Sequence, residues 1–184
     1  MEKNLIVVIR NGKEKKYYYG NLLFEGEFFN GEIWTGKGKE YHYSDCLQYE
    51  GEYLNGKRNG KGKEYNENNE LIFEGEYLNG EKWNGKGKEY KYGHVIYEGE
   101  YLNGKRNGKG KEYDDNDKLI FEGEYLNGER KGKGKEYNTI LNKYEFEGEY
   151  LNGKRWNGKF KAFKYFGELE YKGYYMNGVE KNEN

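Results

Sequence analysis

The residues best suited to covalent chemistry lie together in one short segment of the chain. His42, Ser44, Asp45 and Cys46 supply a base, a hydroxyl, an acid and a thiol. A nucleophilic hydrolase needs such groups around one substrate, together with donors that stabilise an oxyanion. This segment reads as a polar connection without an oxyanion hole. We therefore interpret it as a loop and predict that the protein is not an enzyme and has no catalytic residues.

The other candidate ligand-binding patterns are also incomplete. His42, His94 and Cys46 are too few for a zinc set. The acidic run 114–117 lacks the glycine and the distal glutamate of a calcium loop, and we interpret it as a solvated turn. Gly56–Lys61 has the wrong glycine spacing for a phosphate-binding loop and lacks a hydroxyl residue after its lysine. We therefore predict no metal and no cofactor.

The last of these segments belongs to a pattern that recurs along the chain. The pattern is aromatic-Glu-Gly-Glu-aromatic-x-Asn-Gly, and successive copies start 24 or 25 residues apart. A period of this length indicates one small unit stacked many times. Such repetition argues against an enzyme, because catalysis needs unlike groups gathered at one point. The copies start at Phe24, Tyr49, Phe73, Tyr97, Phe121 and Phe146, with a weakened copy at Tyr171.

Within one copy, two extended segments flank a turn signal. In residues 71–77 apolar residues alternate with glutamates, which predicts a β-strand with two unlike faces. Asn79 and Gly80 follow, and both residue types tolerate the positive φ of a two-residue hairpin turn. Residues 85–90 form the second strand, so each unit is predicted to be a β-hairpin. Antiparallel pairing then sets unlike charges opposite one another: Glu50 and Glu52 against Lys61 and Lys63.

The glycines inside the strands need a separate explanation. Glycine weakens a strand, so its recurrence in both strands of every copy indicates a geometric need. A patch without side chains lets a neighbouring ring lie flat on the backbone and permits strong twist. We expect the second ring of each copy to stack on the glycines of an adjacent copy. These rings include Tyr53, Tyr77, Tyr101 and Tyr125.

Together these features predict an all-β protein: an elongated, twisted, single-layer antiparallel sheet of stacked β-hairpins. Residues 1–23 depart from the pattern and are predicted to form a divergent N-terminal capping hairpin. Residues 24–159 form the repeats. The pattern decays over residues 160–184, which are predicted to form a degenerate last repeat and a C-terminal cap.

Composition restricts the class of partner. The chain is 35% charged and only 34% hydrophobic, but its 18% aromatic content and its lack of proline indicate folding rather than disorder. A net charge of −1 with interleaved Lys and Glu gives no electrostatic drive toward nucleic acid. Leu5–Ile9 is too short for a signal-peptide core or a membrane span, and a single cysteine fits a reducing compartment. We expect a soluble, cytoplasmic protein, with membrane or cytoskeletal structures as further locations to consider.

Residues 49–62 resemble the MORN (membrane occupation and recognition nexus) repeat, whose pattern is Tyr-x-Gly-x-Trp/Tyr-x-Asn-Gly-x-x-x-Gly-x-Gly. The resemblance extends over residues 24–178, with Tyr or Phe at the Trp position and Asn or Lys where His is common. It implies a curved single-layer sheet that serves as an interaction module or scaffold and takes a peptide or helix in a grooved face. Self-association occurs in some members, and phosphoinositide contact is proposed for the family and disputed.

These observations predict a noncatalytic protein–protein interaction scaffold that binds a protein or peptide partner on an aromatic-lined groove. The alternative is a peripheral membrane or phosphoinositide-binding module using the Lys-Arg pairs at 57–58, 105–106 and 154–155. A homodimer is a further option, whereas nucleic acid is not expected. The tryptophans follow turns, as exposed anchors or as packing. The predicted partner-binding residues are Tyr53, Tyr77, Tyr101, Tyr125, Tyr150, Trp34, Trp83 and Trp156.

Overall fold

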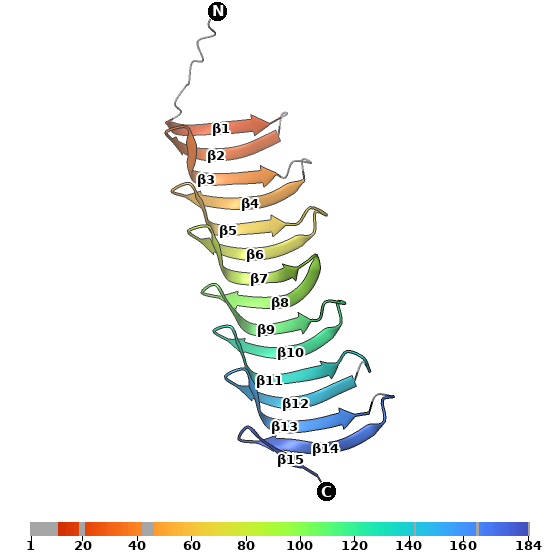
Figure 1. The fold of residues 1–184 in the computed structure, drawn as a ribbon. Helices are drawn as coiled ribbons and strands as arrows, with labels where there is room; N and C mark the ends of the chain where they lie inside the picture. Colours follow the sequence, from red (N-terminus) through yellow and green to blue (C-terminus); the bar gives the residue numbers. More distant parts are fainter. Residues whose placement is uncertain (1–10, 19–20, 42–45, 142, 165, 184) are drawn as a thin grey trace, which may run out of the picture. The chain divides into compact units, whose positions relative to one another are not determined.

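The computed structural model describes residues 11–18, 21–41, 46–141, 143–164 and 166–183. It confirms the predicted fold class, because these residues form one open, single-layer sheet of fifteen strands in sequence order (Figure 1). The described part of the chain contains no helix that could cross a membrane. The strands are β1 (Gly12–Tyr18), β2 (Asn21–Phe29), β3 (Glu32–Tyr41), β4 (Leu47–Leu54), β5 (Lys57–Tyr65), β6 (Leu71–Leu78), β7 (Glu81–Lys91), β8 (His94–Leu102), β9 (Lys105–Tyr113), β10 (Leu119–Leu126), β11 (Glu129–Asn138), β12 (Lys143–Leu151), β13 (Lys154–Phe163), β14 (Leu169–Met176) and β15 (Val179–Asn182).

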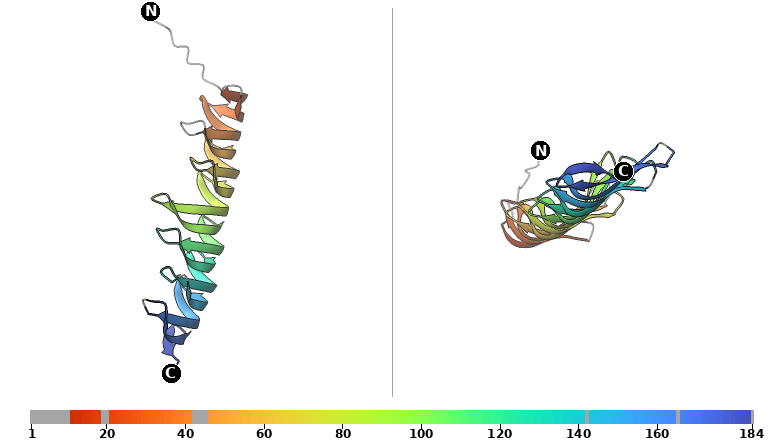
Figure 2. Two further views of the ribbon diagram at one scale, coloured as in Figure 1. Left: turned by 90° about the vertical axis from the view of Figure 1, so that its right-hand side faces the viewer. Right: turned by 90° about the horizontal axis from the view of Figure 1, so that it is seen from below.

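The chain divides into two compact units, residues 1–85 and residues 86–184. Strands β1 to β6 belong to the first unit and β8 to β15 to the second, while β7 crosses the boundary. Consecutive strands within each unit pair in antiparallel fashion. Within the second unit, the connections between successive hairpins project from one side of the sheet (Figure 2).

The Asn-Gly turns have the geometry that the sequence predicts. At all seven turns Asn takes a φ between 51° and 54°, and the Gly that follows it also has positive φ. This is the pattern of a type I′ turn, whose twist matches that of the two strands that it joins. The turn fixes the register of its hairpin, as where Leu126 pairs with Glu129 across Asn127 and Gly128. The Asn-Gly pair therefore determines where each hairpin turns back.

The predicted opposition of charges is correct for one pair and altered for the other. Glu50 pairs with Lys63, as expected, but the register shifts after Gly51. As a result the carboxylate of Glu52 accepts a hydrogen bond from the backbone N–H of Lys61, at 2.9 Å. Gly60 makes this possible, since its φ of +84° turns the backbone toward Glu52.

The core is made of aromatic rings that lie on glycine. Every buried hydrophobic side chain among the described residues is Phe or Tyr. A Cβ added at Gly51 or Gly62 would lie 2.3 or 2.5 Å from the hydroxyl oxygen of Tyr49, so only glycine fits beneath that ring. The prediction named the second ring of each copy, but the ring that covers the glycines is mainly the first. The second ring Tyr53 reaches back to Gly38, where an added Cβ would lie 3.2 Å from it.

The second rings connect one repeat to the next. The ring of Tyr49 contacts that of Tyr53 in its own repeat at a centroid distance of 5.6 Å and that of Tyr77 in the next at 5.1 Å. Both pairs are edge-to-face, a geometry worth about 0.5–1.5 kcal/mol beyond the burial of area. The same alternation recurs in the second unit, where the ring of Tyr97 contacts those of Tyr101 and Tyr125. Each unit is thus held together by a continuous row of rings.

The two ends of the sheet depart from the repeat pattern in different ways. The first strand of the predicted N-terminal hairpin, with Leu5–Ile9, lies outside the described residues, while β1 pairs with β2 as an added strand. At the other end Phe160 replaces a repeat glycine, and its ring covers Gly173 of β14 instead, where an added Cβ would lie 2.7 Å from it. At the C-terminal end a ring therefore stands where the other repeats have a glycine, and it covers a glycine of the neighbouring strand. The boundaries of the two caps stay predictions.

Candidate functional site

An arginine lies on the outer side of the first ring in several repeats. The guanidinium carbon of Arg58 is 4.2 Å from the centroid of the Tyr49 ring, a cation–π contact. The same guanidinium donates two hydrogen bonds to the carboxylate of Glu40 in the preceding repeat, at 3.1 and 2.5 Å. The hydroxyl of Tyr53 also donates to Glu40, at 2.5 Å. One carboxylate therefore binds an arginine and a tyrosine of the following repeat.

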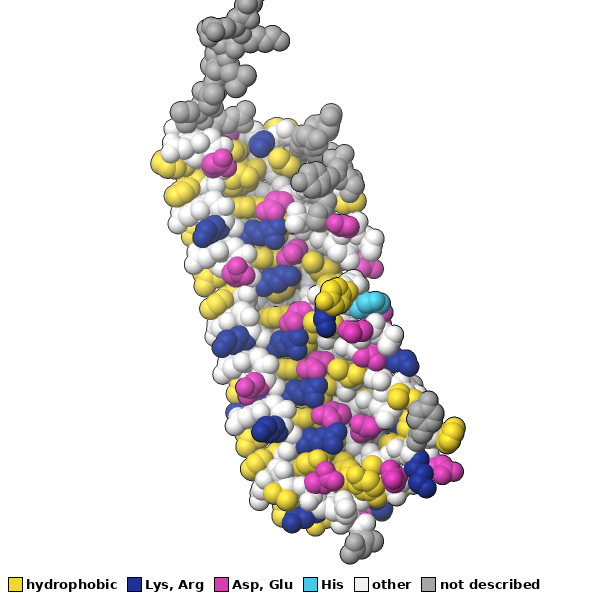
Figure 3. Space-filling view, viewed as in Figure 1, with side chains coloured by type: hydrophobic (Ala, Val, Ile, Leu, Met, Phe, Trp, Pro, Cys, Tyr) yellow, Lys and Arg dark blue, Asp and Glu magenta, His cyan; other side chains and the backbone are white. Residues whose placement is uncertain are grey.

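The arrangement recurs in the second unit, and we call it the Arg–Glu column. Arg130 lies 4.0 Å from the centroid of the Phe121 ring, donates to Glu112 of the preceding repeat at 2.5 Å, and donates to Glu136 of its own at 3.0 Å. Figure 3 shows basic and acidic side chains alternating along this face within each unit. The column comprises Glu40, Arg58, Glu64 and Lys82 in the first unit and Glu89, Arg106, Glu112, Arg130, Glu136 and Arg155 in the second.

Burial and ion pairing act on the pKa values of this column in opposite directions. Burial raises the pKa of Glu112, but hydrogen bonds from Arg130 and Tyr125 outweigh it and leave the pKa below its ordinary value. The pKa of Glu40 is lowered by the same kind of balance. Burial and the hydrogen bond to Glu112 raise the pKa of Tyr125, and burial raises that of Tyr49 to about 12. Charged carboxylates and neutral phenols therefore coexist in the column at neutral pH.

The predicted partner-binding tyrosines lie beneath this column. Tyr53, Tyr77, Tyr125 and Tyr150 are at most 7% exposed, and Tyr101 is partly buried. On this face a partner would reach the rings only by displacing the arginines and glutamates above them, whereas Tyr125 and Tyr150 also border a groove near the Asn-Gly turns. Their contact with a partner stays a prediction, and the surface presented on this side is the column itself.

Sequence reasoning missed the arginines of the column, although a signal was present. Arg58 pairs with Tyr53 and Glu64 pairs with Tyr49, so both stand opposite ring positions of the neighbouring strand. Opposite residues share a face, which places Arg58 and Glu64 on the side of the rings. Tyr150 has a buried hydroxyl without a hydrogen-bond partner among the described residues.

The predicted tryptophans pack on neighbouring groups and keep part of their surface exposed. The ring of Trp34 lies 5.2 Å from that of Phe29 and is 38% exposed. Trp83 and Trp156 are partly buried. A Cβ added at Gly178 would lie 3.3 Å from the ring of Trp156, so this ring rests against the turn of the next repeat. The structure shows the packing contact and leaves the anchor role a prediction.

The groove of the first unit lies on the face opposite the Arg–Glu column. It is open, has a volume of about 640 Å³ and crosses β2 to β6. Glycine backbone forms its floor, Lys and Glu side chains form its walls, and Leu22, Leu23 and Phe24 line it at β2. Phe24 is the one ring among these lining residues, so the ladder of rings that the sequence suggested does not line the groove. Among the ion pairs of the walls are Lys37–Glu52, Lys39–Glu50 and Lys63–Glu74, at 3.9, 3.6 and 3.2 Å.

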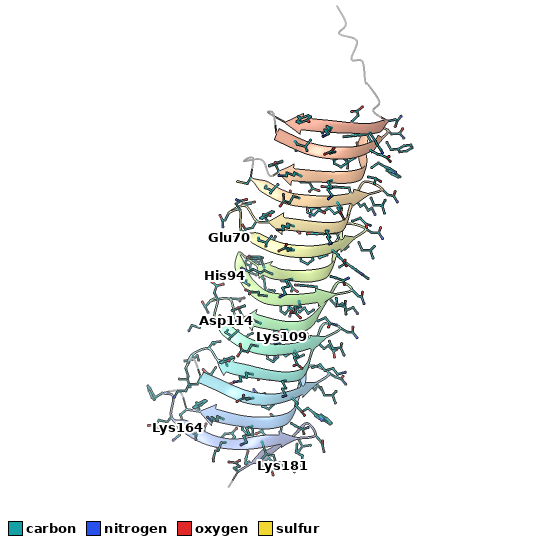
Figure 4. All side chains as sticks on the ribbon, turned by 180° about the vertical axis from the view of Figure 1, so that it is seen from behind. Glu70, His94, Lys109, Asp114, Lys164 and Lys181 are labelled. Atoms are coloured by element: carbon teal, nitrogen blue, oxygen red, sulfur yellow. The ribbon has the colours of Figure 1, made fainter. Side chains whose placement is uncertain are left out.

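The second unit carries a different groove close to its Asn-Gly turns. It has a volume of about 440 Å³ and is lined by Leu126, Leu151 and Trp156 together with charged residues that include Glu124 and Lys131. Seen from behind, Lys109 of this unit lies over the strands, whereas Asp114 and Lys164 lie toward the edge formed by the connections (Figure 4). Three of the predicted partner-binding residues, Tyr125, Tyr150 and Trp156, thus line an open groove.

The candidate catalytic segment remains largely without a structural description. Residues 42–45, with His42, Ser44 and Asp45, lie outside the described residues, and Cys46 is a partly buried free thiol. The described residues hold no cluster of three or more His, Cys, Asp or Glu side chains able to bind a metal ion. The interpretation that the segment is a loop therefore stays a prediction.

The acidic run in the connection before β10 forms a turn, as predicted. The carboxylate of Asp114 accepts hydrogen bonds from the backbone N–H groups of Asn116 and Lys118, each at 2.9 Å. This is the ordinary way in which Asp stabilises a turn. Asp117 of the same turn pairs with His94 of β8, at 3.1 Å between Nδ1 and Oδ2. The His94–Asp117 pair therefore links this turn to the start of β8.

Only the lysines of the Lys-Arg pairs that were considered for membrane contact are free to meet a membrane surface. Their arginines belong to the Arg–Glu column and are ion-paired, whereas the lysines Lys57, Lys105 and Lys154 are exposed. The intervening turns carry exposed glutamates, Glu81 and Glu129. The exposed charged residues that follow these turns therefore alternate in sign along the sequence and do not form a basic row.

Two comparisons with known proteins complete this description. The sequence model of the MORN repeat matches residues 49–69, 97–118 and 121–139. The matched segments fall on hairpins that carry the rings, the strand glycines and the Asn-Gly turns described above. A comparison with curated proteins gives no match.

Proposed function

We propose that this chain, whose sequence matches the MORN repeat over three segments, is a noncatalytic scaffold that holds a protein or peptide partner. The observation that carries the proposal is the open groove across β2 to β6, with charged walls and a backbone floor. The groove belongs to no single repeat, because each repeat supplies one segment of its floor and walls. An elongated partner segment would therefore be bound along several repeats at once.

The chemistry of the groove indicates how a partner would be selected. The side chains of Lys37, Lys39 and Glu50 are 80%, 43% and 35% exposed, so their ion pairs are worth about 0–1 kcal/mol each. A partner could exchange these pairs for its own charges at little cost. The glycine floor lets it approach the backbone closely. Specificity would then come from the order of charges along the partner, which sets register and suppresses wrong sequences.

A capture experiment with matched variants tests this proposal. The immobilised full chain is compared with Glu50→Lys/Glu74→Lys, which reverses charges on the groove wall, and with Glu67→Lys, an exposed connection outside it. Circular dichroism confirms that each variant is folded. We expect specific capture from a cell lysate by the wild type and by the control but not by the wall variant. Equal capture by the wall variant would contradict the proposal, as would the absence of any specific capture.

Peripheral membrane contact is less well supported as a function. It would rest on Lys57, Lys105 and Lys154, which are separated in sequence by the exposed Glu81 and Glu129. Each lysine near an anionic surface gains about 1 kcal/mol, and the glutamates offset part of that gain. Sedimentation with vesicles that contain an anionic phosphoinositide, at low salt, separates the two functions. Binding that is lost when the three lysines are changed to glutamate would favour membrane contact over the scaffold.

A further inference from the structure

The residue that follows the column arginine differs among three successive repeats of the second unit. It is Asn107, Lys131 and Trp156 in turn, and all three residues line the groove near the Asn-Gly turns. The repeat with tryptophan has one residue more between its arginine and the next glycine. The three segments are Arg106–Gly108, Arg130–Gly132 and Arg155–Gly158. We call this groove of the second unit the turn groove, and it contains both kinds of repeat.

The extra residue changes which carbonyl binds the turn of the following hairpin. In the last of the three repeats, the backbone carbonyl of Trp156 accepts a hydrogen bond from the N–H of Gly178, at 2.9 Å. In the other two repeats the carbonyl of the arginine accepts this bond, and the arginine side chain belongs to the Arg–Glu column. The bond therefore brings an indole ring to the turn in one repeat and no ring in the other two. Those two bonds join Gly128 to Arg106 at 2.9 Å and Gly153 to Arg130 at 3.0 Å.

The space over the turn glycine is filled in one repeat and open in the other two. A Cβ added at Gly178 would lie 3.3 Å from the indole ring of Trp156. A Cβ added at Gly128 or at Gly153 would meet no described atom within 4 Å. Leu126 and Leu151, two residues before these glycines, line the turn groove. Two positions that correspond to that of the Trp156 ring are therefore open beside the groove.

The first unit shows the same two kinds of repeat. The carbonyl of Trp34 accepts the hydrogen bond from Gly56 at 3.0 Å, and the carbonyl of Arg58 accepts that from Gly80 at 2.8 Å. A Cβ added at Gly80 would again meet no described atom within 4 Å. The ring of Trp34 packs on Phe29 of its own hairpin, so we take Trp156 as the example of an indole over a turn.

We propose that the second unit binds a partner segment whose tryptophan side chains occupy the open positions over Gly128 and Gly153. Each indole rests on a turn glycine, as Trp156 rests on Gly178, and packs against Leu126 or Leu151. Leu126 is 40% exposed, so an indole that covers it removes apolar surface from water. The site is distinct from the groove of the first unit and adds a second binding region to the proposed scaffold.

Two carboxylates make tryptophan a better occupant than phenylalanine. Glu124 and Glu149 line the turn groove and are exposed. Glu124 accepts a hydrogen bond from the backbone N–H of Lys133 at 3.2 Å, and Glu149 accepts one from the side-chain amide of Asn157 at 3.1 Å. A carboxylate has two oxygens and about four lone-pair sites, so each can accept a further donor. A buried indole needs a partner for its N–H, whereas a phenyl ring has no donor to offer.

The distance between repeats sets the spacing of the tryptophans in the partner. Successive repeats are two strands apart, which is about 10 Å. In a polyproline II segment, residues i and i+3 lie on the same side and roughly 9 Å apart. In a β-strand, successive residues on one side are only about 7 Å apart. The partner segment is therefore a polyproline II peptide with two tryptophans three residues apart.

Fluorescence anisotropy with labelled peptides tests the proposal on the full chain. The probe is a fluorescein-labelled peptide with the core Trp-Pro-Pro-Trp. It is compared with a Trp-Pro-Pro-Pro-Trp peptide, whose second ring turns away from the groove, and with Ala-Pro-Pro-Ala. We expect saturable binding of the first peptide, binding weaker by at least about tenfold for the second, and none for the third. A first peptide that does not bind saturably, or equal binding of the two tryptophan peptides, would overturn the proposal.

Variants of the chain show whether the peptide binds at the turn groove. Leu126→Ser/Leu151→Ser removes its apolar wall, and Lys131→Trp fills it with an indole of the chain itself. The matched control is Leu54→Ser/Leu102→Ser, which changes two leucines, each 46% exposed, before turns that follow tryptophan repeats. Circular dichroism confirms that each variant is folded. We expect both groove variants to bind the Trp-Pro-Pro-Trp peptide at least about tenfold more weakly and the control to bind it as the wild type does.

Two outcomes of this comparison would overturn the proposal. The first is a groove variant that binds as tightly as the wild type, and the second is a control that weakens binding equally. The charge-reversed wall variant of the first unit should also bind the peptide normally, and loss of binding there would place the peptide in the other groove. A failure of this site is thereby distinguished from a failure of the proposed scaffold groove.

Discussion

Alkaline pH should unfold this protein steeply, because its core phenols cannot ionise while they are buried. Burial is the main reason that the pKa values of Tyr53, Tyr77, Tyr101, Tyr125 and Tyr150 lie far above the ordinary 10.0. Below pH 10 the folded and unfolded chains both keep these protons, so the free energy of unfolding does not change through them. Above pH 10 only the unfolded chain releases them, and stability falls as pH rises.

The size of the effect follows from the number of rings. Each phenol that stays protonated in the folded state but ionises in the unfolded state removes about 1.4 kcal/mol of stability per pH unit. Five such rings remove about 7 kcal/mol by pH 11. Domains are typically stable by only about 5–15 kcal/mol. We therefore expect unfolding within roughly one to two pH units above the ordinary tyrosine value.

Two optical signals measured together check this expectation. The near-ultraviolet absorbance of phenolate counts ionised tyrosines, and far-ultraviolet circular dichroism follows the strands. The buried set should ionise only together with loss of the strand signal. Ionisation of all 22 tyrosines near pH 10 with the strand signal retained would refute the reasoning.

Matched variants then assign the effect to the core. Tyr77→Phe removes one buried phenol, so the slope of unfolding free energy against pH should decrease by about 1.4 kcal/mol per pH unit. Tyr92→Phe is the matched control, because it changes a ring that is 88% exposed and leaves the buried set intact. The slope is the informative quantity, because Tyr77→Phe also loses a hydrogen bond to Glu64 that lowers stability at every pH.

Three further predictions concern the column and the glycines, each measured by urea unfolding followed by circular dichroism. Because the pKa of Glu112 is lowered, its stabilisation is complete above the ordinary carboxyl value of 4.5 and should fade as pH falls below it; Glu112→Gln should weaken this acid dependence, and an unchanged profile would argue against the ion pairs. Arg130→Met should cost about 1–3 kcal/mol, because Glu112 and Glu136 lose its hydrogen bonds and keep only Arg106 and Arg155 as ion-pair partners, while Lys131→Met should stay within about 0.5 kcal/mol; equal effects would contradict the assignment. Gly110→Ala should cost at least about 1–3 kcal/mol, since its Cβ would lie 2.5 Å from the hydroxyl oxygen of Tyr97, and a neutral result would mean that the ring is not fixed there.

The parts of the fold that local chemistry determines were predictable from the sequence. Asn127 and Gly128 encode their own turn, and the alternation around Phe121 and Tyr125 encodes which side chains enter the core. Such features depend on residues a few positions apart, so a single copy of the repeat contains them. Periodicity then extends one copy to the whole sheet.

The character of the surface depended on contacts between repeats and was harder to predict. Arg58 reaches Glu40, a residue eighteen positions earlier in another hairpin, and this contact turns a row of rings into a buried core. Trp156 packs on Gly178 of the following turn, so its exposure depends on a segment that its own repeat does not include. The groove was expected among rings, but that of the first unit lies on the opposite face, because the arginines fill the ring side.

The arginines and the second rings of the repeats reach back along the chain. The ring of Tyr125 leans on that of Tyr97, and Arg130 reaches back to Glu112, so each hairpin docks on structure that precedes it. A nascent chain leaving the ribosome from its amino end would therefore find, for every new hairpin, a finished template. Growth of the stack can keep pace with synthesis, because these backward links need only residues that have already been made.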